Sequence, residues 1–219
     1  MNALLKKILD LLFPLRCPFC RSLLKEEEES VCRKCKAELP ATDKGSESQI
    51  FPHISGCFSA FFYEGLVRSS LLRYKFGGLS VYADSYAGIL SERFGGRLRV
   101  CNTVSWVPLS RKRLRKRGYD QAALIAEGLA AKLGLPCEAL LMKTTDNVPQ
   151  STTRSAEQRR TNVRGVYRPL DAASVRGKTV LLVDDIVTTG STIGECARVL
   201  KAAGAAGVYA VTVARNRIG

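Results

Sequence analysis

The sequence of 219 residues predicts an α/β fold, a parallel β-sheet with flanking helices, preceded by a small module that holds four cysteines. Two observations predict it. Beyond residue 50, strand-like apolar runs alternate with helix-like runs, which is the order of parallel strands joined by crossover helices. Before residue 40, two Cys-x-x-Cys pairs have the spacing of a metal site. We expect an amino-terminal helix and the cysteine module in residues 1–40, a linker in 41–50 and the main domain in 51–219.

The composition is that of a folded and strongly basic protein. Hydrophobic residues make up 46% of the chain and charges of both signs are present, which argues against disorder. The formal net charge of +14 favours polyanionic partners, meaning nucleic acid, anionic lipid or phosphorylated small molecules, but does not choose among them. No cleavable secretion signal precedes the cysteines, so we expect the protein in the reducing cytoplasm.

The first thirteen residues can form an amphipathic helix, because leucine, isoleucine and phenylalanine recur among Lys6, Lys7 and Asp10. The segment is too short, and too often interrupted by charge, to span a membrane, so we expect no integral membrane segment. We expect this helix to dock on the folded body. Peripheral binding to a membrane or to a partner is the alternative.

The two cysteine pairs predict a structural zinc site. Each pair can present two thiolates from one tight turn, and four sulfurs complete the tetrahedral coordination that Zn²⁺ prefers. Such a closed site leaves no position for hydrolytic chemistry. A redox dithiol or two disulfides are the alternatives, although neither pair lies in a thioredoxin-like strand and helix pattern. The expected zinc ligands are Cys17, Cys20, Cys32 and Cys35.

Residues 41–49 are small and polar and indicate a linker. In the main domain, short apolar runs predict strands, and longer periodic or alanine-rich runs predict helices. We expect strands over 57–63, 104–107, 139–143, 179–183 and 208–213. We expect helices over 66–74, 81–94, 121–133 and 192–203.

The most informative segment, 180–192, has the sequence Val-Leu-Leu-Val-Asp-Asp-Ile-Val-Thr-Thr-Gly-Ser-Thr. Four aliphatic residues suit a central strand covered on both faces, so Asp184 and Asp185 should lie at its carboxyl end, where open α/β sheets bind ligands. These carboxylates can accept hydrogen bonds from ribose hydroxyls or hold Mg²⁺. Hydroxyls and N–H groups at the start of the next helix suit a phosphate. They belong to Thr188, Thr189, Gly190, Ser191 and Thr192. An ordinary buried strand and capped helix is the alternative.

All thirteen positions of this segment resemble the phosphoribosyl-pyrophosphate (PRPP) motif of the type I phosphoribosyltransferases. The cysteine module, residues 106–109, 117–121 and 158–163, and this motif, in that order, together resemble the ComF family. That family is similar to the type I phosphoribosyltransferases, carries an amino-terminal zinc module and is associated with DNA uptake during bacterial natural transformation. The resemblance implies a five-stranded parallel core and a small hood that includes residues 74–78.

Two basic stretches interrupt the regular pattern. Six of the seven residues in 111–117 are cationic, and residues 144–168 carry five arginines with little hydrophobic periodicity. A structureless insert of that length in a compact domain is usually functional or disordered. Transfer from PRPP needs cations to neutralise the departing pyrophosphate and a mobile cover to exclude water, and both stretches have that composition. A solvated charged surface is the alternative for each.

The resemblance also implies roles for individual residues. Residues 107–110 would form the pyrophosphate loop, and the second basic stretch would form the flexible loop. Asp184, Asp185 and Arg117 would be the catalytic residues. Besides the hydroxyl-rich segment, the substrate-binding residues would be Val107, Pro108, Leu109, Ser110, Arg159 and Arg160. One position departs from the pattern, because Asp120 stands where we expect asparagine, so a donor amide is missing there.

Two functions fit the sequence. One is a PRPP-dependent transferase in which the acidic pair fixes the ribose and Mg²⁺ binds the pyrophosphate. Its acceptor and general base are not identified, and the only histidine, His53, is expected at the surface beside the linker. The other is a non-catalytic protein that binds single-stranded DNA or acts in regulation, which the basic excess favours. The expected partners are PRPP or a related phosphorylated ribose, single-stranded DNA, competence proteins and, in a homo-oligomer, a second copy of the chain.

Overall fold

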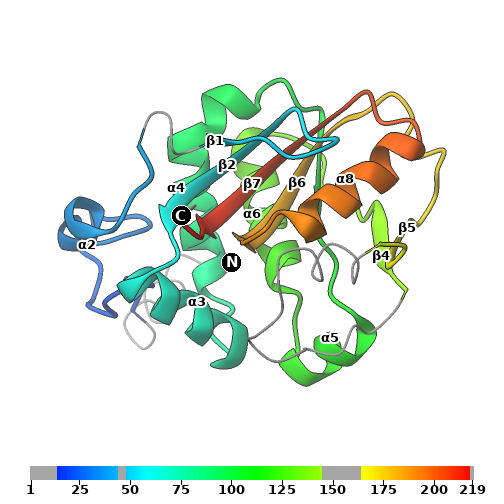
Figure 1. The fold of residues 1–219 in the computed structure, drawn as a ribbon. Coiled ribbons are helices and arrows are strands. Elements are labelled where there is room, and N and C mark those ends of the chain that lie inside the picture. Colours follow the sequence, from blue (N-terminus) through cyan, green and yellow to red (C-terminus); the bar gives the residue numbers. More distant parts are fainter. Residues whose placement is uncertain (1–13, 44–47, 145–163, 218–219) are drawn as a thin grey trace, which may run out of the picture.

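The computed structural model describes residues 14–43, 48–144 and 164–217. Its centre is a five-stranded sheet with the order β1-β2-β7-β6-β3 (Figure 1). These strands are β1 (Ser48–Gln49), β2 (Gly56–Phe62), β3 (Thr103–Trp106), β6 (Thr179–Val187) and β7 (Gly207–Arg215). A separate two-stranded sheet consists of β4 (Leu141–Lys143) and β5 (Tyr167–Pro169). The helix expected in residues 1–13 lies outside the described residues.

The strand directions confirm the α/β class and correct one detail. β2, β7, β6 and β3 pair in parallel, whereas β1 pairs with β2 in the antiparallel sense. The expected five parallel strands are therefore four. The strand expected at 139–143 is present as β4, but it pairs antiparallel with β5, because the chain turns away after one parallel bridge from Cys137 to Val104. The expectation of an insert without structure as far as residue 168 is wrong at its end, where β5 begins.

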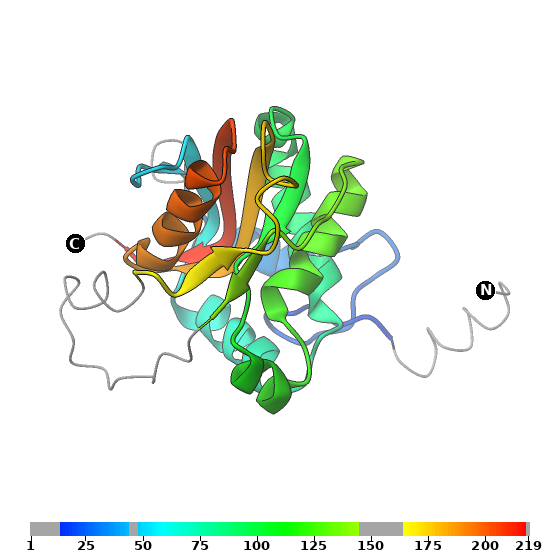
Figure 2. The same ribbon diagram turned by 90° about the vertical axis from the view of Figure 1, so that its right-hand side faces the viewer.

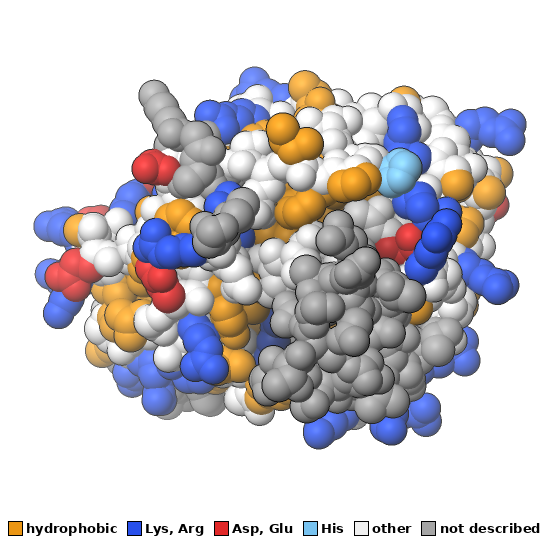
Figure 3. Space-filling model, in the orientation of Figure 1, with side chains coloured by type: hydrophobic (Ala, Val, Ile, Leu, Met, Phe, Trp, Pro, Cys, Tyr) orange, Lys and Arg blue, Asp and Glu red, His pale blue; other side chains and the backbone are white. Residues whose placement is uncertain are grey.

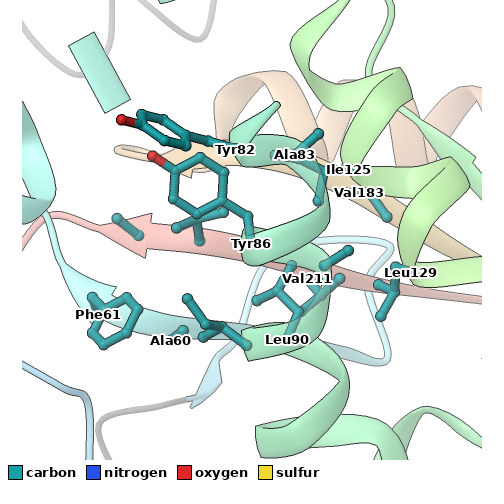
Figure 4. Close-up of a cluster of buried hydrophobic side chains, with 14 of the residues drawn as sticks. Ala60, Phe61, Tyr82, Ala83, Tyr86, Leu90, Ile125, Leu129, Val183 and Val211 are labelled. Carbon is teal, nitrogen blue, oxygen red and sulfur yellow. The ribbon is translucent and has the colours of Figure 1, made fainter. Parts of the chain in front are cut away.

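Helices cover both faces of the central sheet (Figure 2). The helices of the described residues are α2 (Arg33–Glu38), α3 (Gly65–Phe76), α4 (Tyr82–Leu98), α5 (Arg111–Arg117), α6 (Gln121–Leu133) and α8 (Ser191–Ala202). α4 and α6 pack together on one face, where Leu90 and Leu129 lie beside Val211 of the sheet (Figure 4), and α8 covers the other. The helices and strands predicted for the main domain are all present, with ends within four residues of those expected.

The aliphatic run of β6 is buried on both sides. Leu181 and Val183 belong to the core under α4 and α6, whereas Val180 and Leu182 belong to the core under α8. All four side chains are fully buried, which confirms the prediction of a covered central strand. The strand is longer than expected, because it continues to pair with β7 as far as Val187.

The cysteine module packs directly against the main domain. The ring of Phe19, which lies between two of the cysteines, is 5.4 Å from that of Phe61 and 6.1 Å from that of Tyr86, both in edge-on geometry. The segment expected to be a linker also meets the sheet at both ends. The Thr42 hydroxyl donates to the Ser59 carbonyl at 2.6 Å, and β1 pairs with β2. Module and main domain therefore share one core.

Candidate functional site

The acidic pair lies where one neighbouring strand has ended. β3 stops at Trp106, opposite Val183, whereas β6 continues through Asp184 and Asp185. Successive side chains of a strand point to opposite faces of the sheet. Asp184 accordingly interacts with Cys57 and Cys196 on the α8 side, and Asp185 with groups from α3 and α5 on the other side. The pair is inside the strand of β6, but it borders an open edge beyond β3.

Burial makes this edge unfavourable for two negative charges. Desolvation raises the pKa of Asp184 well above its ordinary value, and the neighbouring carboxylate of Asp185 raises it further. The Lys75 ammonium acts in the opposite direction, as does the backbone N–H of Asp185, which donates to the Asp184 carboxylate at 2.8 Å. A site that holds a carboxylate under these conditions is suited to bind a cation or a hydroxyl donor.

Lys75 is a site residue that the sequence did not identify. Its Nζ atom lies 2.9 Å from Oδ2 of Asp185, and the two side chains are 20% and 10% exposed. Lys75 is the penultimate residue of α3, in the segment that the ComF resemblance assigns to the hood. Sequence spacing does not reveal this contact, because it depends on how α3 packs across the end of the sheet.

The hydroxyl-rich segment forms the bend between β6 and α8. Gly190 has φ +73°, in the left-handed region, and α8 begins at the next residue. No side chain caps the first turn of α8, and the Thr189 and Ser191 hydroxyls lie 2.8 Å apart. A Cβ atom on Gly190 would lie 2.1 Å from the ring of Phe51, so glycine is required by space as well as by conformation. The bend presents hydroxyls and a helix N-terminus together, which is a geometry suited to phosphate.

The predicted pyrophosphate loop follows β3 directly. The backbone N–H of Val107 donates to the Val183 carbonyl at 3.0 Å, so the loop starts beside the acidic pair. Ser110 is buried and caps α5 by accepting from the Arg113 N–H at 3.4 Å. Pro108 and Leu109, between them, are partly exposed. The first basic stretch, 111–117, is thus not only a charged surface but a short capped helix at the end of this loop.

Asp120 connects this loop to α6. Its Oδ2 accepts from the Leu109 N–H at 2.9 Å, while its Oδ1 accepts from the N–H groups of Ala122 and Ala123 at 3.1 and 3.3 Å. All three partners are donors, so a carboxylate suits the position. The donor amide that the family resemblance led us to expect has no acceptor among these contacts, which explains the aspartate. Burial raises the pKa of Asp120, and the three hydrogen bonds oppose this effect.

Arg117 lies close to the acidic pair, but its guanidinium already contacts Gln121 and Phe76. Its Nη1 donates to Oε1 of Gln121 at 2.6 Å, and its guanidinium lies 5.0 Å from the centre of the Phe76 ring. Burial lowers the pKa of Arg117, and the charge of Asp185 raises it. The structure therefore brings Arg117 into the neighbourhood of Asp185. Arg159 and Arg160 lie outside the described residues.

Four cysteines form the second candidate site. The thiol sulfurs of Cys17, Cys20, Cys32 and Cys35 all lie within 4.8 Å of one another. Sulfurs at about 2.3 Å from a tetrahedral Zn²⁺ are about 3.8 Å apart, so this cluster fits the ion. The arrangement is already organised, because Cys32 is the N-cap of α2 and accepts from the Cys35 N–H at 3.4 Å. These residues would hold Zn²⁺ in a closed structural site.

The thiol environment is consistent with a shared metal. Burial opposes ionisation of Cys20, but hydrogen bonds from the Ser22 hydroxyl and N–H lower its pKa to about 6. Burial raises the pKa of Cys35, which the neighbouring thiols raise further. Zn²⁺ binds thiolates, so binding of the ion would ionise these thiols and release their protons.

Two hollows in the described surface lie away from the acidic pair. One of about 660 Å³ lies between the acidic tip of the cysteine module and the exposed sides of α4 and α6, and one of about 570 Å³ lies further along α4. Neither is lined by the acidic pair or by the hydroxyl-rich bend. His53 is exposed, as expected, and contributes to neither.

Comparison with known proteins defines the class first. Residues 120–219 match the phosphoribosyl transferase domain family, and residues 8–45 match the double zinc ribbon domain family. The class is therefore a phosphoribosyltransferase-domain protein with an amino-terminal zinc ribbon. Competence protein ComFC of Streptococcus pneumoniae is 30% identical over 203 residues, which cover 91% of this chain and 87% of that protein. The chain belongs to the ComF family.

Other known proteins are similar to part or most of the chain. Competence protein F of Haemophilus influenzae is 26% identical over 216 residues, covering 88% of this chain and 93% of that protein. DNA utilization protein YhgH of Escherichia coli K12 is 30% identical over 128 residues, covering 58% and 56%. Among solved structures, glutamine PRPP amidotransferase of Bacillus subtilis is 22% identical with a TM-score of 0.40, over 64% of this chain and 30% of the enzyme. Within the described residues, no helix is both long and apolar enough to cross a membrane.

Proposed function

We propose that this protein binds PRPP, or a closely related pentose 5-phosphate, together with Mg²⁺ at the carboxyl end of β6. One observation supports this most strongly. A carboxylate pair that borders an open sheet edge is followed, after two residues, by a bend of hydroxyls at the start of a helix. The match of residues 120–219 to the phosphoribosyl transferase domain family also supports this proposal.

Each group of the site has a task in such binding. Asp184 and Asp185 would accept hydrogen bonds from the two ribose hydroxyls, and their oxygens are the ligands that Mg²⁺ prefers. Residues 188–192 would hold the 5-phosphate through hydroxyls and the first N–H groups of α8. Bound Mg²⁺ would supply positive charge to the pyrophosphate of PRPP. Arg117 would add a second cation at the same edge.

In a transfer reaction the bond between the anomeric carbon and pyrophosphate would break as an acceptor bonds to that carbon, and the electron pair would leave with pyrophosphate. The described residues would fix the ribose and shield the departing charge. Arg159 and Arg160 belong to this proposal by family position alone. We propose a cytoplasmic location, because cysteines that bind zinc need to stay reduced, as they do in that compartment.

The relatives connect this chemistry with DNA. Their names associate them with competence and DNA utilization, and we propose that this protein acts in the uptake or processing of DNA as well. Binding of single-stranded DNA is the second candidate function. It is favoured by α5, which carries six cations and no buried residue, and by Phe76 nearby, whose side chain is 68% exposed. Figure 3 shows further Lys and Arg side chains around the rim of one face.

Calorimetry tests the first proposal. PRPP is titrated into zinc-loaded protein with and without Mg²⁺, in buffer free of chelator so that the cysteine site stays loaded. We expect Mg²⁺-dependent binding that is lost in Asp184→Asn/Asp185→Asn. The second candidate is tested with a labelled single strand, whose affinity should fall steeply with salt and fall again in Arg111→Gln/Lys112→Gln. A strand that fails to bind at low salt contradicts that second candidate.

A further inference from the structure

Helix α3 joins the cysteine module to the acidic pair. At the module, the Ser70 hydroxyl donates to the Pro18 carbonyl at 2.5 Å, and Nη2 of Arg73 donates to the Pro18 and Phe19 carbonyls at 2.9 and 2.8 Å. Pro18 and Phe19 are the two residues between Cys17 and Cys20. The loop that presents two of the four thiols is therefore held by side chains of α3.

The next residues of the same helix reach the other site. The Tyr74 hydroxyl donates to the Gln121 carbonyl at 2.9 Å, and the Tyr74 ring packs against those of Tyr86 and Tyr119 at 5.2 and 5.8 Å. Lys75 follows and pairs with Asp185 at 2.9 Å. The contacts of Tyr74 and the pair with Asp185 thus fix where the Lys75 ammonium lies, two residues after Arg73.

This ion pair changes what a ligand meets at the site. Asp185 is almost fully buried, so its charge needs a partner, and Lys75 already supplies one. An incoming cation competes with the lysine for Oδ2 of that carboxylate. A ligand that brings both a cation and a phosphate can do so at little cost, because the cation takes the carboxylate and the phosphate takes the released ammonium.

We propose that Lys75 is a further binding residue of this site, an internal counter-ion of Asp185 that transfers to a phosphate oxygen of the ligand. Arg73 is the positioning residue that fixes Lys75 by tying α3 to the loop between Cys17 and Cys20. This inference rests on the proposed function for the identity of the ligand. It also gives the zinc module a task at the sugar-phosphate site, because a disordered cysteine loop would release Arg73 and with it the end of α3.

Acetylation of lysines by N-acetoxysuccinimide, read peptide by peptide in a mass spectrometer, measures this positioning on the zinc-loaded full chain. Lys178 is the matched control, since it is also partly buried and ion-paired, to Glu138 at 2.6 Å, but far from α3. Lys36, which is 62% exposed, gives the rate of an accessible lysine. In Arg73→Gln with its zinc retained, we expect Lys75 to react about fivefold faster or more and Lys178 to be unchanged. Asp185→Asn should accelerate Lys75 in the same way.

Two results would overturn the proposal. One is a Lys75 rate in the unaltered protein equal to that of Lys36. The other is a Lys75 rate that stays constant in Arg73→Gln at full zinc content. If Arg73→Gln also accelerates acetylation of Lys178, the fold of that variant is disturbed. Ser70→Ala is then used in its place, and the acetylation rate must again rise at Lys75 and stay constant at Lys178. No arm contains PRPP, so a negative result contradicts the role of Lys75, whereas absence of PRPP binding contradicts the proposed function.

Discussion

Lys75 and Asp185 form an ion pair of 2.9 Å that joins the end of α3 to the carboxyl-terminal part of β6, a central strand of the sheet. It places a cation on a carboxylate that otherwise resembles a ligand for Mg²⁺ or ribose. The same edge holds Asp184, whose charge the fold disfavours. The candidate site thus holds two adjacent buried carboxyl groups with one lysine as their counter-ion, and a ligand that brings a cation or hydroxyl donors would stabilise them.

Removal of the internal cation should ease metal-dependent binding. In Lys75→Met, we expect the Mg²⁺ concentration that half-saturates the site in the absence of PRPP to fall about threefold or more, because Mg²⁺ no longer competes with an ammonium for Asp185. Fluorescence of Trp106, the only tryptophan, can follow the titration, since it ends β3 beside the site. Lys178→Met is the control and should leave the Mg²⁺ requirement unchanged. A requirement that rises in Lys75→Met would contradict this role.

The raised pKa of Asp184 predicts a pH-dependent cost to stability. The folded state keeps a proton that the unfolded chain releases at ordinary carboxyl pH, so the fold is favoured at low pH and loses stability as pH rises toward the folded pKa. Asp184→Asn should remove that loss. At pH 8 we expect a gain of about 1 kcal/mol or more, which raises the Tm by about 2–4 °C for each kcal/mol in a chain of this size. The gain should shrink at pH 5.

Thermal scans of Asp184→Asn at both pH values check this prediction. Asp84→Asn is the control, because Asp84 is 77% exposed in its pair with Lys132. A Tm that falls at pH 8 in Asp184→Asn would show that the native carboxylate is stabilised, in contradiction to the account.

Gly190 lies in the hydroxyl-rich bend, and two glycines elsewhere serve as its controls. Together the three glycines separate the energetic cost of a positive φ from the cost of a steric clash. Gly190 has positive φ and a ring 2.1 Å from any added Cβ, Gly118 has positive φ with open space, and Gly194 has neither constraint. Alanine should cost about 2–3 kcal/mol or more at Gly190, about 1 kcal/mol at Gly118, and nothing or a slight gain at Gly194. Urea unfolding gives the three values. Equal costs at Gly190 and Gly118 would show that Phe51 moves aside without loss.

Position 120 should require a carboxylate side chain in this protein. In Asp120→Asn, the amide nitrogen would face the N–H of either Leu109 or the first turn of α6, so one donor loses its acceptor. We expect a loss of about 1–2 kcal/mol in urea unfolding, and a similar or larger loss in Asp120→Ala. An Asp120→Asn variant as stable as the parent would mean that the hydrogen bond to Leu109 contributes nothing.

Much of this architecture follows from local sequence. Four consecutive aliphatic residues suit a central strand covered on both faces, and paired cysteines at knuckle spacing suit a shared zinc ion. β6 is longer than the sequence predicts, because the strand continues past the acidic pair through Ile186 and Val187, which extend the apolar pattern. The N-cap role of Asp120 can also be predicted from the sequence, since this residue precedes the first residue of a predicted helix.

Other features depend on tertiary packing. Lys75 and Asp185 are remote in sequence, and only the packing of α3 against the tyrosines of α4 and the 118–121 turn brings them together. Docking of the cysteine module was missed for a similar reason. Phe19 looks like one apolar residue in a small knuckle, yet it is 1% exposed because the main domain supplies the rings around it.

Calorimetric titration of PRPP into zinc-loaded protein tests the central claim most directly. The account predicts one site per chain, heat that requires Mg²⁺, and loss of at least about tenfold in affinity when both carboxylates of β6 become amides. Binding of equal strength in that double variant, or no binding of PRPP at any Mg²⁺ concentration, would contradict the assignment of this sheet edge to a sugar phosphate.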